Sequence, residues 1–554
     1  MAIASSVLWT VWRLTTGGGY AAHPAEAPLE LYRPVGVLML LGKAPPPAWF
    51  IEGMGIVAWV ATVAMLVGWR TRASVVVSWL AAASLASYQV SFTASWSHHN
   101  NLPLLAQLAF FGARGGDTWS LDAWRRRRRG SPPLDLPGGY QWSLRLVQIA
   151  VGLMFFSAAM AKWFFGDFTL AWAFSDNLRH QLLARFDWIG APRTAAADWL
   201  LGDVWRYQAA AALNLLAQVT PLTAVLLVDR PRLRLAAGLT FVVEVLALGV
   251  VMDLWNVHWL PLLAVFVDWE HWLCAARGAK ERQERAVAPQ AHPLAPLGAG
   301  ASSGQAAQSA RRRAGVSIFV VAFLAYDLGA AFWLDQSLRT YPFSAYPMFG
   351  YVRAKRPYHR HATYEMLGAV TTILAAAPVP PQAQAWVDGY HTFRMLHRVR
   401  SAKELRQRLG ALTSVLQAQF PELGVWGVRL HLAAFQAEAY PAVAALRPHR
   451  LAVLGELGPQ GLISALGRVQ EQGGQLVVEP QWTGPAPAGA ITYAAIADYS
   501  TEVVALTPVP GPQGSSGSSG TSVRLPRPRG DSVVVLAVVD GVSYVVGEVG
   551  HRRW

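Results

Sequence analysis

Long apolar runs separated by short polar loops dominate the first 334 residues of the chain. Most of these runs approach the length of about 20 residues that a helix needs to cross a membrane. The pattern therefore predicts an α-helical polytopic membrane bundle of about eight to nine transmembrane helices. The run 102–113 reaches membrane length only if its helix begins near Trp96, and one or two further spans precede residue 49. The other expected spans are 49–68, 73–92, 142–165, 204–228, 235–252, 256–273 and 316–334.

Residues 335–554 have the mixed pattern of a folded domain outside the membrane. Ser401 and Glu404 have the spacing of a capping box, and leucines follow them at helical intervals. Apolar residues at 428, 430 and 432 alternate with polar ones, as in a half-buried strand. The apolar segments on either side of Asp540-Gly541 predict a hairpin with a type I′ turn. We therefore expect a C-terminal mixed α/β domain.

These patterns divide the chain into four parts. Residues 286–310 are rich in Ala, Pro, Gly, Ser and Gln, which is typical of a flexible linker. The expected parts are a transmembrane domain at 1–274, a cytoplasmic linker at 275–315, an additional transmembrane helix at 316–334 and an extracytoplasmic soluble region at 335–554.

The distribution of basic residues orients the bundle. When loops are assigned to alternating sides, one side receives 18 Lys and Arg residues, among them the run from Arg125 to Arg129, and the other receives 3. Cytoplasmic loops carry the excess of Lys and Arg. We therefore expect a multi-pass protein of the plasma (inner) membrane with its C-terminal region outside, in contact with membrane lipid.

Composition excludes several other classes. Hydrophobic residues make up 53% of the chain and charged residues 14%, which argues against a disordered protein. The single cysteine excludes a disulfide framework and a multi-cysteine zinc site. The net charge of +14 would suit nucleic acid, but its concentration in short loops between apolar runs indicates topology instead, so no nucleic-acid partner is expected. No metal site is predicted.

A few polar residues stand where a membrane should exclude them. Lys162 lies near the outer end of one span, where it is either an interfacial lysine beside aromatic residues or a desolvated base. His98 and His99 lie in a turn on the same side, with Asn100 and Asn101, and one histidine suits a hydrogen-bond or proton-carrying role. Glu244 and Asp327 are central in their spans, as either interhelical hydrogen-bond partners or proton-relay groups.

Three segments carry a resemblance to a known family. They are Gly68-Trp69-Arg70-Thr71-Arg72, then Ser95-Trp96-Ser97-His98-His99-Asn100 with the later Trp119-Ser120-Leu121-Asp122, and finally Phe156-Ser157-Ala158-Ala159-Met160-Ala161-Lys162. In this order, residues 49–270 resemble the transmembrane domain of vitamin K-dependent gamma-carboxylase and its bacterial relatives, the HTTM (horizontally transferred transmembrane) family.

The resemblance implies an enzyme that oxidises a lipid quinol. Lys162 matches the lysine that deprotonates reduced vitamin K, and His99 matches a histidine that assists at the quinone site, so these two are the expected catalytic residues. His98, Asn100 and Glu244 are expected to contribute to binding of a reduced, vitamin K-like quinone. The implied activity is that of a carboxylase- or epoxidase-like lyase, with an extracytoplasmic protein as a further substrate or partner.

Three departures leave other functions open. The carboxylase has two lysines where this chain has Ala161-Lys162, and it has a histidine in the helix where this chain has Glu244. Residues 335–554 do not resemble its propeptide- and glutamate-binding region. Quinol oxidation is therefore the better supported half of the chemistry, since a shared fold does not transfer an activity. The alternatives are a non-enzymatic membrane scaffold whose outer domain binds a partner, and a transporter in which Glu244 and Asp327 relay protons.

Overall fold

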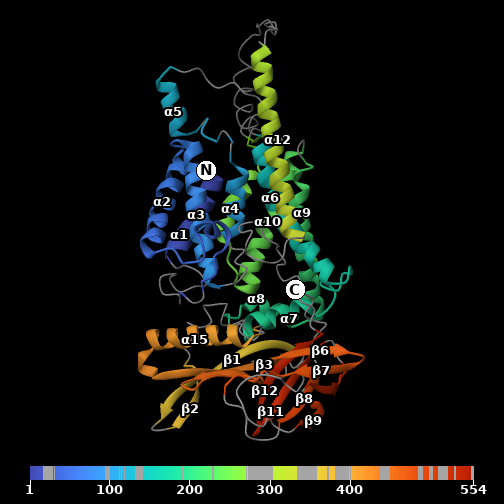
Figure 1. Ribbon diagram of the computed structural model, residues 1–554. Helices are drawn as coiled ribbons and strands as arrows, with labels where there is room; N and C mark the ends of the chain where they lie inside the picture. The colour runs from blue at the N-terminus through green and yellow to red at the C-terminus, as the bar shows by residue number, and fades with distance from the viewer. Residues whose placement is uncertain are drawn as a thin grey trace, which may run out of the picture.

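The apolar runs of the first half form long helices, and the last third of the chain forms sheets (Figure 1). The computed structural model describes residues 1–16, 29, 32–93, 100–111, 113, 115–117, 119–130, 141–188, 191–227, 230–269, 271–272, 303–332, 358–370, 373–380, 399, 401–436, 449–484, 491–497, 503–509, 522–529 and 532–550.

The helices are α1 (Ala2–Thr16), η3 (Gly36–Leu41), α2 (Ala48–Val67), α3 (Thr71–Thr93), α4 (Asn101–Ala109), α5 (Leu121–Arg128), α6 (Gln141–Phe165), α7 (Asn177–Leu183), η5 (Ala184–Trp188), α8 (Ala195–Leu201), α9 (Val204–Thr223), α10 (Pro231–Met252), η6 (Val257–Val265), α12 (Ser303–Phe332), α15 (Ala402–Gln419) and η10 (Pro421–Leu423).

Within the described ranges, four helices are long and apolar enough to cross a membrane, namely α2, α3, α6 and α10. This finding fits a membrane protein with a helical bundle. The expected total of eight to nine spans is not confirmed. The predicted span at 204–228 corresponds to α9, which has 20 residues but carries several polar ones.

Two of the expected spans differ from the observed elements for local reasons. The segment 256–273 forms η6, a 3-10 helix of nine residues with Pro261 in its interior. Proline removes a backbone donor and 3-10 turns are used in short pieces, so this segment does not continue as a long helix. The later helix α12 begins at Ser303, inside the segment expected to be a linker, and its apolar part is Ala314–Gly329.

Two of the segments that carry the family resemblance meet at the loop between α2 and α3. Asp122 accepts hydrogen bonds from the backbone N–H groups of Arg70 and Thr71 at 2.9 and 2.8 Å, and from the Thr71 hydroxyl at 2.9 Å. Burial alone raises the pKa of the Asp122 carboxyl, but these hydrogen bonds and the nearby Arg126 outweigh it, so the pKa is lowered. Asp122 therefore caps the start of α3 with a charge.

The helices α6, α9 and α10 pack side by side, with α9 in contact with both of the others (Figure 1). Gly152 on α6 permits close approach, because a Cβ added there would lie 2.8 Å from the Cα of Leu222 on α9. The short helices α7 and α8 lie at the end of this group that faces the sheets, and α5 lies at the opposite end (Figure 1).

The C-terminal part contains two sheets. A nine-stranded sheet has the order β2-β1-β3-β4-β12-β11-β8-β9, with β5 on β4, and a three-stranded sheet has the order β10-β7-β6. The strands are β1 (Tyr358–Val370), β2 (Ile373–Pro378), β3 (Val425–Gln436), β4 (His449–Gly458), β5 (Gly461–Ile463), β6 (Arg468–Gln472), β7 (Gln475–Glu479), β8 (Ile491–Ala497), β9 (Val503–Val509), β10 (Val523–Pro526), β11 (Val533–Val539) and β12 (Val542–Val549).

The expected helix and hairpin of this part are confirmed. The Ser401 side chain accepts a hydrogen bond from the backbone N–H of Glu404 at 3.2 Å, at the start of α15. Asp540 and Gly541, the two residues between β11 and β12, both have positive φ angles, as a type I′ turn requires. The mixed α/β character of the C-terminal region therefore follows from its local sequence signals.

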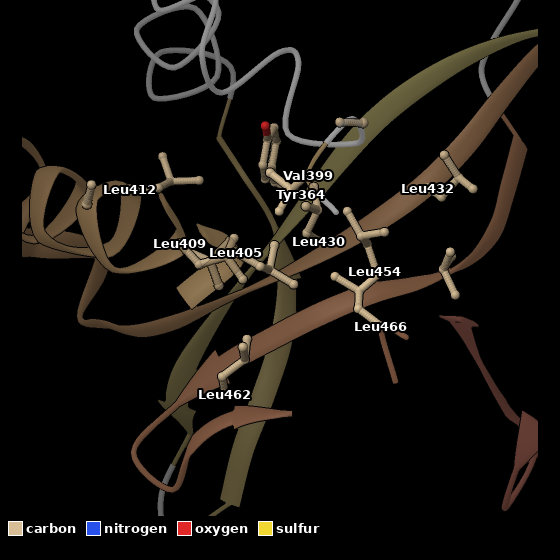
Figure 2. Close-up of a cluster of buried hydrophobic side chains, with 14 of the residues drawn as sticks. Tyr364, Val399, Leu405, Leu409, Leu412, Leu430, Leu432, Leu454, Leu462 and Leu466 are labelled. Atoms are coloured by element: carbon tan, nitrogen blue, oxygen red, sulfur yellow. The ribbon is translucent and has the colours of Figure 1, made fainter. Parts of the chain in front are cut away.

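The helix α15 covers one face of the larger sheet and forms the core shown in Figure 2. Leu405, Leu409 and Leu412 of α15 point toward Leu430 of β3 and Leu454 of β4. The alternation predicted for β3 is observed only in part: Val428, Leu430 and Leu432 are buried as expected, but His431 is buried too, and its Nε2 lies 2.9 Å from a carboxylate oxygen of Glu365 on β1. The same apolar cluster also includes four residues of the helical half, which links the two halves of the protein: Tyr32, Leu38, Tyr88 and Phe92.

Candidate functional site

Lys162 is a fully buried lysine in the last turn of α6. Only 1% of its surface is exposed, so it does not extend to the interface as a snorkelling lysine would. Its Nζ donates to Oδ1 of Asn214 at 2.9 Å and to Oε1 of Gln218 at 2.6 Å. Nζ also lies 4.4 Å from the centroid of the Trp172 ring, within the range of a cation–π contact.

Glu244 lies on the other side of the same two amides. The Nδ2 group of Asn214 lies 2.7 Å from both carboxylate oxygens of Glu244, and Nε2 of Gln218 donates to Oε1 at 2.8 Å. Glu244 is on α10 and is 1% exposed. The cluster therefore joins α6, α9 and α10 through a lysine, two amides and a carboxylate.

The chain provides this arrangement by simple helix geometry. Asn214 and Gln218 are four residues apart on α9, so their side chains lie on one face of the helix. Each amide turns its oxygen toward Lys162 and its nitrogen toward Glu244. This orientation is the one that an amine donor and a carboxylate acceptor require. The oxygen and the nitrogen of each amide therefore both have a hydrogen-bond partner in the cluster.

The geometry at Nζ suits a group that gains and loses a proton. A lysine nitrogen has three positions besides its bond to carbon, and the two amide oxygens occupy two of them. A neutral amine still has two N–H groups for those oxygens, and its lone pair then takes the third position. Both protonation states of Lys162 therefore keep the same two hydrogen bonds.

A cavity of about 240 Å³ adjoins this cluster. Its polar lining comes from Lys162, Asn214, Gln218, Glu244 and, from α7, Gln181. The rest of its wall is mostly apolar: Trp172, Leu178, Leu200, Ala210, Leu213, Ala217, Val243, Ala247, Leu248, Val251 and Met252. A concave, mainly apolar space with a few convergent polar groups is the usual form of a small-molecule site.

The structure brings together two of the five residues predicted for the site, Lys162 and Glu244. His98 and His99 lie outside the described residues. Asn100 is buried, but its Nδ2 donates to Gln89 of α3 at 3.3 Å, and it is not part of the cavity lining.

Asp327 does not extend the cluster. It is buried on α12 and is absent from the cavity lining, and within the described part of the chain its Oδ1 has no hydrogen-bond partner. A proton relay that joins it to Glu244 has no structural support among these residues. In the same part of the chain, no group of three His, Cys, Asp or Glu residues comes together as a metal site.

Asn214, Gln218 and Trp172 belong to the site but were not predicted from sequence. A signal for the two amides is present, since Asn and Gln recur at a spacing of four within an otherwise apolar stretch of α9. Polar amides on the inner face of such a helix form hydrogen bonds to neighbouring helices. Trp172 carries no such signal, because it lies in the connection between α6 and α7 and only the fold brings its ring to Lys162.

Comparison with models of protein families, with curated proteins and with solved structures found no match for this chain.

Proposed function

We propose that the protein is a multi-pass membrane enzyme of the HTTM type that oxidises a lipid quinol, with Lys162 as the base that removes a hydroxyl proton. The observation that carries this proposal is the fully buried Nζ of Lys162, held by two amide oxygens beside a mostly apolar cavity. The resemblance of residues 49–270 to the vitamin K-dependent carboxylase family gives this site its proposed chemistry.

The proposed orientation rests on the two ends of the bundle. The arginine-rich helix α5 lies at one end, and the sheets, α7 and α8 lie at the other (Figure 1). The positive-inside rule assigns the α5 end to the cytoplasm of an inner membrane. The C-terminal domain and the Lys162 cavity then belong to the outer side, where the domain is suited to bind an extracytoplasmic protein.

The cavity fits the head of a reduced quinone. Its apolar wall suits an aromatic ring, and the Lys162 amine offers an acceptor for a hydroxyl proton. When bound, a reduced quinone supplies an acidic hydroxyl and, as it becomes the epoxide, four electrons to one molecule of oxygen, of which one atom enters the epoxide and the other leaves as water. The residues of the chain bind the head, exclude water and hold the proton on Nζ of Lys162.

Glu244 acts in this scheme through the amides. Its carboxylate accepts three N–H···O contacts, which fix the amide oxygens of Asn214 and Gln218 toward Lys162. It also balances the positive charge that Lys162 acquires with a proton, and an unbalanced charge in a buried site is costly. Glu244 is therefore a positioning residue, and Lys162 is the residue that reacts.

Epoxide formation tests the proposal directly. Membranes that contain the full chain receive reduced naphthoquinone and oxygen, and the products are quantified. We expect epoxide from the wild type and a loss of at least about 100-fold in Lys162→Met, the scale of general-base catalysis. Lys162→Arg retains the charge but not the base and is expected to lose activity too, whereas Lys403→Met, an exposed change on α15, is expected to have no effect.

The contrary result is equally informative. If wild-type epoxide does not exceed that of folded, inserted Lys162→Met, the enzymatic proposal is wrong. The scaffold function then becomes the better explanation, and the next experiment is capture of extracytoplasmic partners by the full chain.

A further inference from the structure

The cavity beside Lys162 is open on the side where α9 and α10 face away from the bundle. Leu213 of α9 and Val243 of α10 both line the cavity, yet they are 65% and 60% exposed at the surface of the protein. A residue that is exposed and lines a cavity lies at the mouth of that cavity. Leu213 and Val243 therefore form a mouth between the two helices.

The surface around this mouth is apolar. Leu216 on α9 and Leu246 and Val250 on α10 are exposed large apolar residues, as are Leu213 and Val243 themselves. An apolar helix surface of this kind faces lipid when the helix crosses a membrane, and α10 is long and apolar enough to do so. The mouth therefore opens toward the hydrocarbon region and not toward water.

The depth of the polar cluster agrees with this direction. Glu244 lies eight residues before the end of α10, which corresponds to about 12 Å along the helix axis. A hydrocarbon core is about 30 Å thick, so the cluster lies well inside one leaflet. At the end that faces the sheets, Leu178 of α7 and Leu200 of α8 complete the wall of the cavity.

The size of the cavity limits what can remain inside. A cavity of about 150 Å³ holds a benzene molecule, whereas sites for entire drug-sized ligands have about 300–1,000 Å³. The volume of about 240 Å³ beside Lys162 is sufficient for a head of one or two rings but not for a long hydrocarbon tail as well. The tail of a lipid-like ligand must leave through the mouth.

We infer that the site takes a membrane-dissolved amphiphile, with an acidic ring hydroxyl as its head and a long apolar tail, and that this ligand enters sideways from the bilayer between Leu213 and Val243. The head lies against Lys162, and the tail extends past the two mouth residues into the lipid. This inference rests on the proposed function for the class of ligand and the role of Lys162, and it adds the route by which the ligand enters.

Photolabelling in lipid nanodiscs tests the route without any turnover. The probe is a phenol with a sixteen-carbon tail that carries a diazirine near the ring, and the comparison probe is the same phenol without the tail. The variants Leu213→Trp and Val243→Trp fill the mouth but leave the polar cluster unchanged. Leu216→Trp is the matched control, because Leu216 is 64% exposed on the same helix but does not line the cavity.

We expect the tailed probe to label peptides of α9 and α10 in the wild type and in Leu216→Trp, with at least a ten-fold loss in Leu213→Trp and Val243→Trp. Equal labelling of all four proteins, or stronger labelling by the tail-less probe, overturns the inference. Loss of labelling is accepted only for variants whose unfolding temperature matches that of Leu216→Trp, and Leu213→Ala, which widens the mouth, must retain labelling.

The outcomes also separate this inference from the proposed function. Labelling that depends on the mouth, without any epoxide, supports the route and rejects the quinol chemistry. Epoxide that depends on Lys162, together with labelling that ignores the mouth variants, supports the chemistry and rejects the route.

Discussion

The amide bridges predict that Lys162 and Glu244 stabilise the fold jointly. Lys162→Met leaves Glu244 as a buried charge without its counterpart and leaves two amide oxygens without donors. Glu244→Gln leaves Lys162 without a counter-charge. Removal of one partner of a buried pair costs about 3–5 kcal/mol, whereas removal of both partners costs far less than the sum of the two single losses.

The magnitude follows from the network. We expect each single variant to lose about 3 kcal/mol of the free energy of unfolding, and the double variant to lose about 3 rather than about 6. The coupling energy is then about 3 kcal/mol, at the upper end for residues that share one network. The coupling energy is high because Asn214 and Gln218 each lie at hydrogen-bond distance from both Lys162 and Glu244 and so transmit the interaction between them.

The double-mutant cycle is measured on the wild type, the two single variants and the double variant. Each is unfolded in a mixture of detergent and denaturing surfactant, and unfolding is followed by circular dichroism. The matched control combines Lys162→Met with Gln148→Leu. Gln148 is also buried on α6 and lies about 21 Å along this helix from Lys162. Its side chain donates to the backbone oxygen of Val265 and not to the cluster. The control pair is expected to be additive. Additivity of Lys162→Met and Glu244→Gln within about 0.5 kcal/mol would refute the bridged pair.

Three further predictions concern the packing and capping of other elements. Asp122→Asn is expected to lower the free energy of unfolding by about 1 kcal/mol at pH 7, because it removes the charge that caps α3. Burial raises the pKa of Asp122, but its hydrogen bonds lower it by more, so the pKa in the folded protein is below the ordinary value of 3.8. The stability advantage of the wild type is therefore present above pH 3.8 and is lost as the pH falls through the folded pKa. Unfolding titrations at successive pH values measure this loss. Gly152→Ala is expected to cost about 1–3 kcal/mol in the same unfolding assay, because its Cβ would lie 2.8 Å from the Leu222 backbone. Ser401→Ala is expected to cost about 1 kcal/mol and to weaken amide-exchange protection in the first turn of α15.

Each of these has a control within the chain. Asp198→Asn removes a carboxylate from a half-exposed ion pair and is expected to change stability little. Gly53→Ala places a Cβ in open space, and Ser414→Ala changes an exposed position on α15. If a control variant loses as much stability as its partner, the corresponding contact is not the cause of the loss.

Local signals were sufficient for much of the fold. The apolar runs predicted α2, α3, α6 and α10 to within a few residues, because each run has the length and composition of a helix that can cross a membrane. The capping box predicted the start of α15, and Asp540-Gly541 predicted the turn of the last hairpin, since both depend on residues adjacent in sequence. The length of η6 was not predicted, because the apolar run masked the effect of Pro261.

The site was predicted only in part. Lys162 and Glu244 were recognised because an ionisable side chain within an apolar helix is energetically unfavourable. Their relation was not recognised, because it depends on how α9 turns its polar face between α6 and α10. No pattern within one helix determines that angle. The amides that connect the two residues are neutral, so they stand out less from an apolar helix sequence than charged residues do.

The use of two amides instead of a direct ion pair has a chemical consequence. In a direct contact between Lys162 and Glu244, the hydrogen bond to the carboxylate would change from a charge-assisted one to a neutral one each time Lys162 lost its proton. With the amides between them, the hydrogen bonds of Glu244 among the described residues come from Asn214 and Gln218, which stay neutral in both states of Lys162. A charge-assisted hydrogen bond is about twice as strong as a neutral one. The bridge therefore keeps the hydrogen bonds of Glu244 unchanged at each proton transfer, which suits a base that must be regenerated in a buried cavity.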